Sequence, residues 1–149
     1  MANRRILLIE DNPSDIELTR RAFVRSHITN ELVVVQDGQE ALEYLFGSGA
    51  YAGRDVSDLP ALALLDLHLP KVSGLDVVRA IRADPRTRRM PVVILTSSNE
   101  EQDVAAGYDL GVNSYIQKPV DFERFAEAIR TLGLYWLILN EPPPKAKQS

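Results

Sequence analysis

The sequence contains no cysteine. This absence excludes disulfides and thiolate metal sites, and it fits a reducing compartment. An excess of basic residues is also missing, because the formal net charge is −4, and this argues against nucleic acid as the main partner. No apolar run reaches membrane-spanning length, and the run behind the basic start, Ile6 to Ile9, is too short for a signal peptide. We therefore expect a cytoplasmic protein without a membrane partner.

Two phosphate-binding motifs are absent as well, since neither G-x-x-x-x-G-K-[ST] nor G-x-G-x-x-G occurs. What remains is an ordinary globular composition, with 149 residues of which 45% are hydrophobic and 26% are charged. This length predicts one hydrophobic core and one domain. We expect that domain at residues 4–140, followed by a proline-bearing flexible tail at 141–149 and no output domain.

The most informative segment of the sequence is residues 61–74, ALALLDLHLPKVSG. The run from Ala61 to Leu65 is apolar without alternation, which is typical of a strand buried on both faces. Asp66 follows it, and Pro70 cannot continue a central strand. Asp66 is thus predicted at the carboxyl end of a parallel strand, where open α/β sheets bind ligands. An aspartate that merely supports a turn is the alternative.

Strand and helix patterns alternate five times along the chain. The pattern predicts an α/β fold, a doubly wound five-stranded parallel sheet with helices on both faces. Strand order does not follow from periodicity, and the flavodoxin-like order 2-1-3-4-5 is the usual solution for a small domain. Residues 47–60 are rich in turn-forming residues and lack a clear period, which predicts a loop longer than most connections between helices and strands. The predicted strands are 5–9, 31–36, 61–65, 91–95 and 114–117. Helix caps are expected at Asn12 or Ser14, Asn99 and Asp121, and two further helices are expected to begin at Asp37-Gly38 and Ser73-Gly74.

Polar side chains follow the predicted strands where each one ends. Glu10 and Asp11 follow the first strand, Asp66 the third, Thr96 the fourth and Lys118 the fifth. If the first and third strands are neighbours, three carboxylates meet, and their mutual repulsion favours a bound cation. An all-oxygen site points to Mg²⁺, with Mn²⁺ as the alternative. A carboxylate, a divalent cation, a lysine and a hydroxyl together suit phosphoryl transfer to an aspartate.

The chain resembles the receiver domain of two-component response regulators, the CheY-like family, over residues 4–132. The residues that carry the resemblance are the pair Glu10-Asp11, Asp66 with Pro70 and Gly74, Thr96 followed by a small residue, and Lys118-Pro119. The resemblance implies that Asp66 is the phosphoacceptor. It also implies that Asp11 and Asp66 bind Mg²⁺ directly, that Glu10 acts through water, and that the backbone carbonyl of His68 is a further ligand.

The resemblance also implies a switch. Lys118 would pair with the phosphoryl group, Thr96 would hydrogen-bond it, and Tyr115 would follow Thr96 inward. Lys118-Pro119 is the candidate cis peptide bond. The plain alternatives are that Glu10-Asp11 only caps a helix and that Tyr115 only packs.

The long loop, the segment YDLGVNSYIQKPVDF and the ending LYWLILN resemble single-domain receivers paired with phytochrome-type histidine kinases. The resemblance implies a histidine kinase and an unidentified downstream protein as partners, and a phosphoacceptor rather than a turnover enzyme. It also implies a homodimer, which would cover the surplus apolar surface of the last helix. The dimer interface candidates are Leu134, Tyr135, Trp136, Leu137 and Ile138.

Three other functions remain open from the sequence. A haloacid-dehalogenase-like phosphatase also uses a nucleophilic aspartate with Mg²⁺, but that family has a second aspartate two positions on, where this chain has His68. A degenerate receiver would be an interaction module that is never phosphorylated. A flavin-binding flavodoxin would share the fold, and fold alone does not fix function.

Overall fold

The computed structural model describes residues 5–96, 106, 108–117 and 122–133, without the side chains of Thr96, Tyr115 and Gln117. Its elements follow the alternation that the sequence predicts. In chain order they are β1 (Ile6–Ile9), α1 (Pro13–Arg25), β2 (Leu32–Val35), α2 (Gly38–Phe46), the 3-10 turn η1 (Gly49–Tyr51), β3 (Leu62–Leu65), α3 (Gly74–Ala83), β4 (Val92–Thr96), β5 (Ser114–Gln117) and α5 (Phe122–Gly133).

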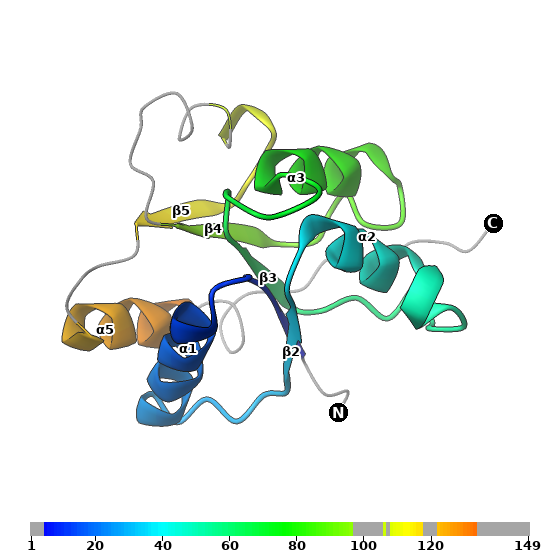
Figure 1. The fold of residues 1–149 in the computed structure, drawn as a ribbon. Coiled ribbons are helices and arrows are strands. Elements are labelled where there is room, and N and C mark those ends of the chain that lie inside the picture. Colours follow the sequence, from blue (N-terminus) through cyan, green and yellow to red (C-terminus); the bar gives the residue numbers. More distant parts are fainter. Residues whose placement is uncertain (1–4, 97–105, 107, 118–121, 134–149) are drawn as a thin grey trace.

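The strands form one parallel sheet in the order β2-β1-β3-β4-β5 (Figure 1). The strands β1 and β3 are neighbours near its centre, and Ile9 of β1 lies opposite Leu65 of β3. These two residues are the last of their strands, so the chain leaves both strands at the same edge of the sheet. The predicted α/β class with a parallel sheet is confirmed.

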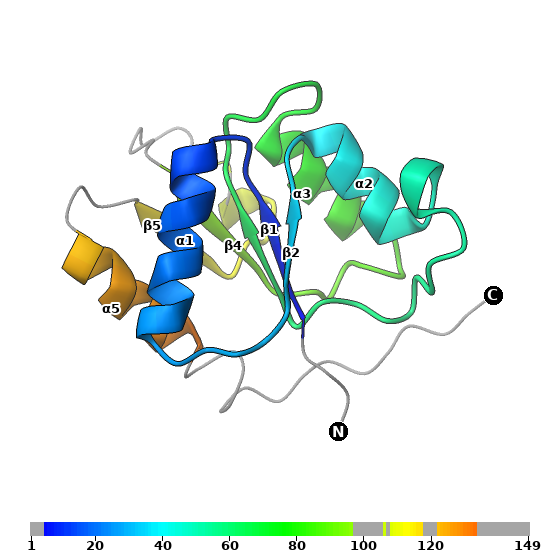
Figure 2. The same cartoon turned by 60° about the horizontal axis from the view of Figure 1, so that its bottom comes forward.

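Helices cover both faces of the sheet (Figure 2). Alternate residues of each central strand face opposite layers: Leu7 and Leu65 belong to the hydrophobic cluster beneath α2 and α3, whereas Leu8 and Leu64 belong to the cluster beneath α1 and α5. Every residue of β1 and β3 is buried. A strand covered on both faces needs apolar residues at every position, and this is why these strands read as continuous apolar runs.

Short polar side chains cap three helices, at the predicted cap Asn12 and at Asp37 and Ser73, where helices were expected to begin. Asn12 Oδ1 accepts the N–H of Ser14 at 2.8 Å and that of Asp15 at 3.2 Å. The carboxylate of Asp37 accepts from the α2 backbone at 2.7 Å, and the hydroxyl of Ser73 accepts from the α3 backbone at 3.2 Å. Each cap satisfies donors that the first helical turn leaves without intrahelical partners. The caps expected at 99 and 121 lie outside the described residues.

The connection at 47–60 is longer than usual, as predicted, but it also contains the turn η1. Arg54 attaches it to the end of α2, because its guanidinium donates to the carbonyl of Leu45 at 3.2 Å and lies 4.4 Å from the ring centre of Tyr44. Burial lowers the pKa of Arg54. The hydroxyl of Tyr51 donates to Glu40 Oε2 at 2.8 Å, and this bond raises the pKa of Tyr51 to about 12.

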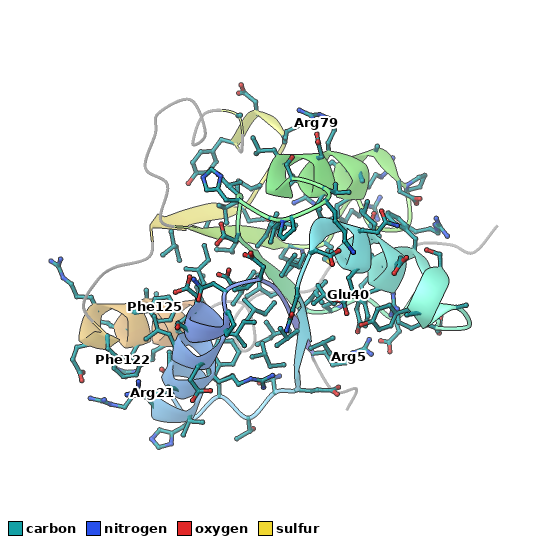
Figure 3. The ribbon with its side chains drawn as sticks, viewed as in Figure 1. Arg5, Arg21, Glu40, Arg79, Phe122 and Phe125 are labelled. Carbon is teal, nitrogen blue, oxygen red and sulfur yellow. The ribbon has the colours of Figure 1, made fainter. Side chains whose placement is uncertain are left out.

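The helices α1 and α5 lie side by side on one face of the sheet (Figure 3). Arg25 pairs with Glu123 at 2.8 Å, and the guanidinium of Arg21 lies 4.8 Å from the ring centre of Phe122. These contacts are at the surface, where an ion pair contributes at most about 1 kcal/mol. The buried ring of Phe125, which is 1% exposed, contributes more to holding α5 on the sheet. No helix among the described residues is long and apolar enough to span a membrane.

Arg82, in the last turn of α3, connects this helix to the segments before β4 and before β5. These segments lie at the amino-terminal edge of the sheet, opposite the carboxyl ends of the strands. Its guanidinium donates to the carbonyls of Met90 at 2.7 Å and Gly111 at 2.8 Å, and to Asn113 Oδ1 at 3.2 Å. Burial lowers the pKa of Arg82, but an arginine remains charged at neutral pH. The side chain thereby satisfies carbonyls before β4 and before β5.

Replacing Arg82 by Met should lower the free energy of unfolding by about 2–3 kcal/mol, because these carbonyls lose their charged donor while the aliphatic packing is kept. Urea unfolding followed by circular dichroism measures the change. Arg79→Met on the same helix is the matched control, since Arg79 is exposed and, among the residues that the structure describes, pairs with Asp76 at the surface. The control should change stability by less than about 0.5 kcal/mol. Equal losses in the two variants would show that the bonds of Arg82 add nothing.

Candidate functional site

Two acidic side chains lie where the central strands end. Glu10 follows β1 and Asp66 follows β3, and the adjacency of these strands brings their carboxylates together. Glu10 is 2% exposed and Asp66 is 8% exposed. Carboxylates are rarely buried to this extent in folded proteins unless they are paired or bind a cation. The burial therefore indicates a specific role for both groups.

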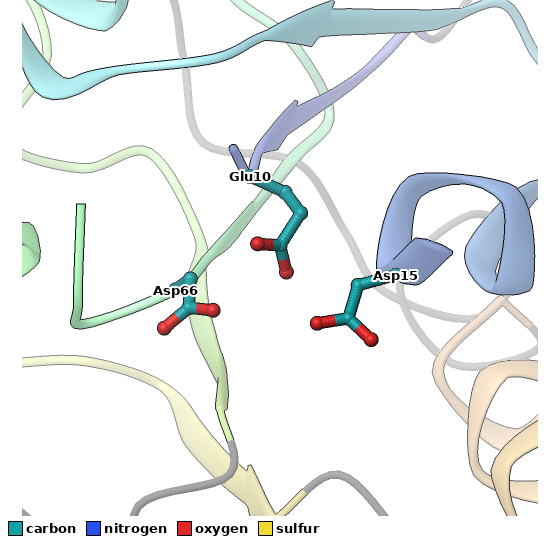
Figure 4. Close-up of side chains that lie close together, drawn as sticks. All are labelled: Glu10, Asp15 and Asp66. Atoms are coloured by element: carbon teal, nitrogen blue, oxygen red, sulfur yellow. The ribbon is translucent and has the colours of Figure 1, made fainter. Parts of the chain in front are cut away.

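Asp15, in the first turn of α1, adds a third carboxylate to this pair. One carboxylate oxygen from each of Glu10, Asp15 and Asp66 lies within 4.8 Å of the others, and the three side chains point into a common space (Figure 4). Two unit negative charges at that separation repel by about 3 kcal/mol at an effective dielectric constant of 20. The arrangement therefore favours a positive group at its centre.

Backbone hydrogen bonds fix the direction of two of these carboxylates. The N–H of Asn12 donates to Glu10 Oε2 at 3.2 Å, and the N–H of His68 donates to Asp66 Oδ1 at 3.0 Å. Both donors lie two residues after the carboxylate that they bind, at the start of the connection that follows each strand. Hydrogen bonds to a carboxylate favour its charged form. They also hold each side chain in one orientation.

Two glycines allow the loop after Asp66 to fold closely on itself and on its neighbour. A Cβ on Gly74 would lie 2.3 Å from the backbone oxygen of Asp66, and a Cβ on Gly38 would lie 2.0 Å from that of Val72. The N–H of Gly74 donates to the carbonyl of Leu67 at 2.9 Å. No side chain fits at either position, because real Cβ atoms do not approach backbone atoms so closely. The backbone around Asp66 thus depends on both glycines.

The structure brings together two of the site residues that the sequence predicts, Glu10 and Asp66. Asp11 is exposed and is not one of the three carboxylates that share the 4.8 Å group. The side chain of His68 is exposed too, as expected if only its backbone takes part in the site. Asp11 as a direct ligand and the carbonyl of His68 as a further ligand stay predictions.

The structure does not describe the side chains of the remaining predicted site residues. Lys118, Pro119 and the interface candidates at 134–138 are outside the described residues. Thr96 ends β4 and Tyr115 lies within β5, but their side chains are not described. Their roles, and the cis peptide bond at 118–119, stay predictions.

Sequence reasoning missed Asp15. The sequence does place Asp15 three residues after the Asn12 cap, in the first turn of the helix that follows β1. An acidic residue there is ordinary, because it stabilises the positive end of the helix dipole. Only the path of the chain from Glu10 into α1 shows that its carboxylate turns toward Asp66.

Comparison with known proteins identifies the family. The family model described as "Response regulator receiver domain" matches residues 6–130. The response regulator Rcp1 of Synechocystis sp. is 38% identical over 132 residues, which cover 89% of this chain and 88% of Rcp1. The Mn²⁺-bound form of Rcp1 superposes with a TM-score of 0.85 at 35% identity, covering 95% of this chain and 99% of Rcp1.

Two further solved structures are similar over nearly the whole chain. The phosphorylated cyanobacterial phytochrome response regulator RcpA has a TM-score of 0.87 at 39% identity, covering 96% of this chain and 100% of RcpA. The bacteriophytochrome response regulator RtBRR has a TM-score of 0.78 at 50% identity, covering 97% of this chain and 87% of RtBRR. The agreement of sequence, fold and strand-end carboxylates gives one conclusion: this chain belongs to the response regulator receiver-domain family of two-component signalling.

Proposed function

We propose that this protein accepts a phosphoryl group on Asp66 from the phosphohistidine of a sensor kinase, with a divalent cation held beside it. The observation that carries the proposal is the buried carboxylate of Asp66 at the end of β3, grouped with Glu10 and Asp15. The relationship to RcpA, which is described in its phosphorylated form, supports the reaction. The relationship to Rcp1, which is described with Mn²⁺, supports the cation.

The reaction needs little from the protein beyond position and charge. One oxygen of Asp66 attacks phosphorus, an O–P bond forms, the N–P bond of the phosphohistidine breaks, and the released imidazole nitrogen takes up a proton. The product is an acyl phosphate on Asp66. The N–H of His68 holds Oδ1 of Asp66, so the carboxylate meets the donor in a fixed orientation.

The donor set of the site fits a hard divalent cation. The three grouped side chains offer only carboxylate oxygens, the chain has no cysteine, and the imidazole of His68 is exposed. Mg²⁺ prefers such oxygen ligands, and Mn²⁺ accepts them too. Asp66, Asp11 and the carbonyl of His68 would hold the ion, with Glu10 acting through water. The bound ion would offset negative charge on the transferring phosphoryl group.

The predicted switch completes the proposal. Lys118 would pair with the phosphoryl group and Thr96 would hydrogen-bond it, with Tyr115 following. Phosphorylation then shifts a two-state equilibrium and changes which protein surface binds a downstream partner. Coupling of this kind is typically about 1–3 kcal/mol.

The mass of the intact protein tests this function. After incubation with acetyl phosphate and Mg²⁺, the protein should gain one phosphoryl group, and EDTA should prevent the gain. Hydroxylamine should remove the adduct, because it cleaves acyl phosphates and leaves phosphoserine and phosphothreonine intact. An adduct that survives hydroxylamine would contradict an aspartyl acceptor. A protein that binds the cation but takes no phosphoryl group from acetyl phosphate or a histidine kinase would be an interaction module.

We further propose that the protein is a phosphoacceptor and not a turnover phosphatase. The haloacid-dehalogenase pattern needs a second aspartate two residues after the nucleophile, and His68 stands there with its side chain exposed. One phosphoryl group per chain is expected in the mass experiment. In a separate assay, the protein should release no phosphate from a phosphomonoester. Sustained hydrolysis of such an ester would contradict this assignment.

The partner proposed here is a phytochrome-type histidine kinase, supported by the relationship to RcpA and RtBRR. We also propose a homodimer in which the apolar stretch 134–138 covers its counterpart. Removing residues 133–149 should then give a monomer by light scattering, since the truncation deletes that stretch. An unchanged dimer mass would contradict the interface.

A further inference from the structure

Asp15 has no part in the site as the family resemblance describes it, yet its carboxylate belongs to the same 4.8 Å group as Glu10 and Asp66. It comes from a different element, the first turn of α1, whereas the other two follow strands. Asp15 is half-buried, so its position is set by the fold. The question is whether its carboxylate serves the helix or the site.

Another side chain makes the bond that a capping box would give to Asp15. In a capping box, the residue three positions after the cap bonds back to the backbone N–H of the cap residue. Here that residue is Asp15 and the cap is Asn12, but the N–H of Asn12 donates to Glu10 Oε2 at 3.2 Å. Glu10 thus supplies the acceptor that the capping box assigns to Asp15.

The spacing of the oxygens suits one shared cation. Ligands on opposite sides of a six-coordinate Mg²⁺ are about 4.2 Å apart, twice the metal–oxygen distance. The three carboxylate oxygens lie within 4.8 Å of one another, and this limit is slightly larger than the distance between two opposite ligands. A cation between them is therefore within reach of all three carboxylates, by direct contact or through one bound water.

We propose that Asp15 is an additional carboxylate of the divalent-cation site and strengthens cation binding there. The inference rests on the cation site proposed above and adds a residue that the family pattern does not assign. Asp15 acts on the cation together with Glu10, Asp15 from the first turn of α1 and Glu10 from the position directly after β1. Loss of the Asp15 charge should weaken Mn²⁺ binding by about tenfold, a change of about 1.4 kcal/mol.

Titration with Mn²⁺ alone, followed by the electron paramagnetic resonance signal of the free ion, tests the inference on the full chain. Wild type is compared with Asp15→Asn, which keeps the size of the side chain and removes its charge. Glu17→Gln is the matched control, because it removes one charge from the same helix outside the carboxylate group. We expect a Kd about tenfold higher for Asp15→Asn and within about twofold of wild type for Glu17→Gln. Circular dichroism checks that each variant is folded.

Two further variants separate failure of the inference from failure of the proposed function. Asp15→Glu keeps the charge and should recover most of the affinity, which a purely packing role would not produce. Asp66→Asn should lose Mn²⁺ binding. If Asp66→Asn loses binding while Asp15→Asn stays within twofold of wild type, the role of Asp15 is wrong and the proposed cation site stands. If wild type binds no Mn²⁺ at millimolar concentration, the cation site itself is wrong.

Discussion

Asp66→Asn is expected to give no phosphoryl adduct with acetyl phosphate and Mg²⁺, against about one per chain for wild type. The reason is chemical, because an amide oxygen is a far weaker nucleophile than a carboxylate and cannot form a stable acyl phosphate. The change should leave the fold intact. Asparagine has the same shape, and its amide oxygen can still accept the N–H of His68 that now bonds Asp66 Oδ1.

Intact mass spectrometry of both proteins, with EDTA controls, makes the measurement. Asp76→Asn is the matched control, since Asp76 is an exposed aspartate in the first turn of α3, close in sequence to the Asp66 loop. The control should be labelled at the rate of wild type. A hydroxylamine-sensitive adduct that persists in Asp66→Asn would place the acceptor on another carboxylate, and Glu10 or Asp15 would be the first to test.

The central part of the fold could be predicted because burial leaves a strong mark on the sequence. Strands covered on both faces must be apolar at every position, as in β1 and β3, so their limits were predicted within one residue. Helix starts were equally clear, because only a few short polar side chains can accept the first backbone N–H groups. Asn12, Asp37 and Ser73 all do so.

The site could be predicted only where a residue's place along its own strand decides its position. Glu10 and Asp66 each follow a buried strand directly, so their meeting needed only the adjacency of β1 and β3. The position of the Asp15 carboxylate, in contrast, depends on the angle at which α1 leaves the sheet. The bonds from Arg54 to the end of α2 likewise join residues whose contact no local pattern predicts. Such contacts follow from tertiary packing, which a single sequence does not encode as a periodic pattern.

Gly74→Ala should destabilise the protein strongly, although it adds only one methyl group near the site. Helix propensity alone favours alanine over glycine by about 1 kcal/mol within a helix. Here the added Cβ would lie 2.3 Å from the backbone oxygen of Asp66 and 2.6 Å from the Cα of Leu67. Backbone atoms cannot rotate away as a side chain can, so the steric term should win. We expect the free energy of unfolding to fall by about 3 kcal/mol, measured by urea unfolding.

The same variant should also be labelled by acetyl phosphate at least about tenfold more slowly, because relief of the clash displaces the backbone that carries Asp66. Gly53→Ala separates the steric term from general backbone strain. Gly53 has a φ of 91° but nothing within 4 Å of its added Cβ, so alanine should cost about 1 kcal/mol and leave labelling unchanged. If Gly74→Ala lost stability yet kept wild-type labelling, the backbone of the Asp66 loop would not control the reactivity of Asp66. Loss of both would show that the fit of α3 against this loop sets the position of the phosphoacceptor.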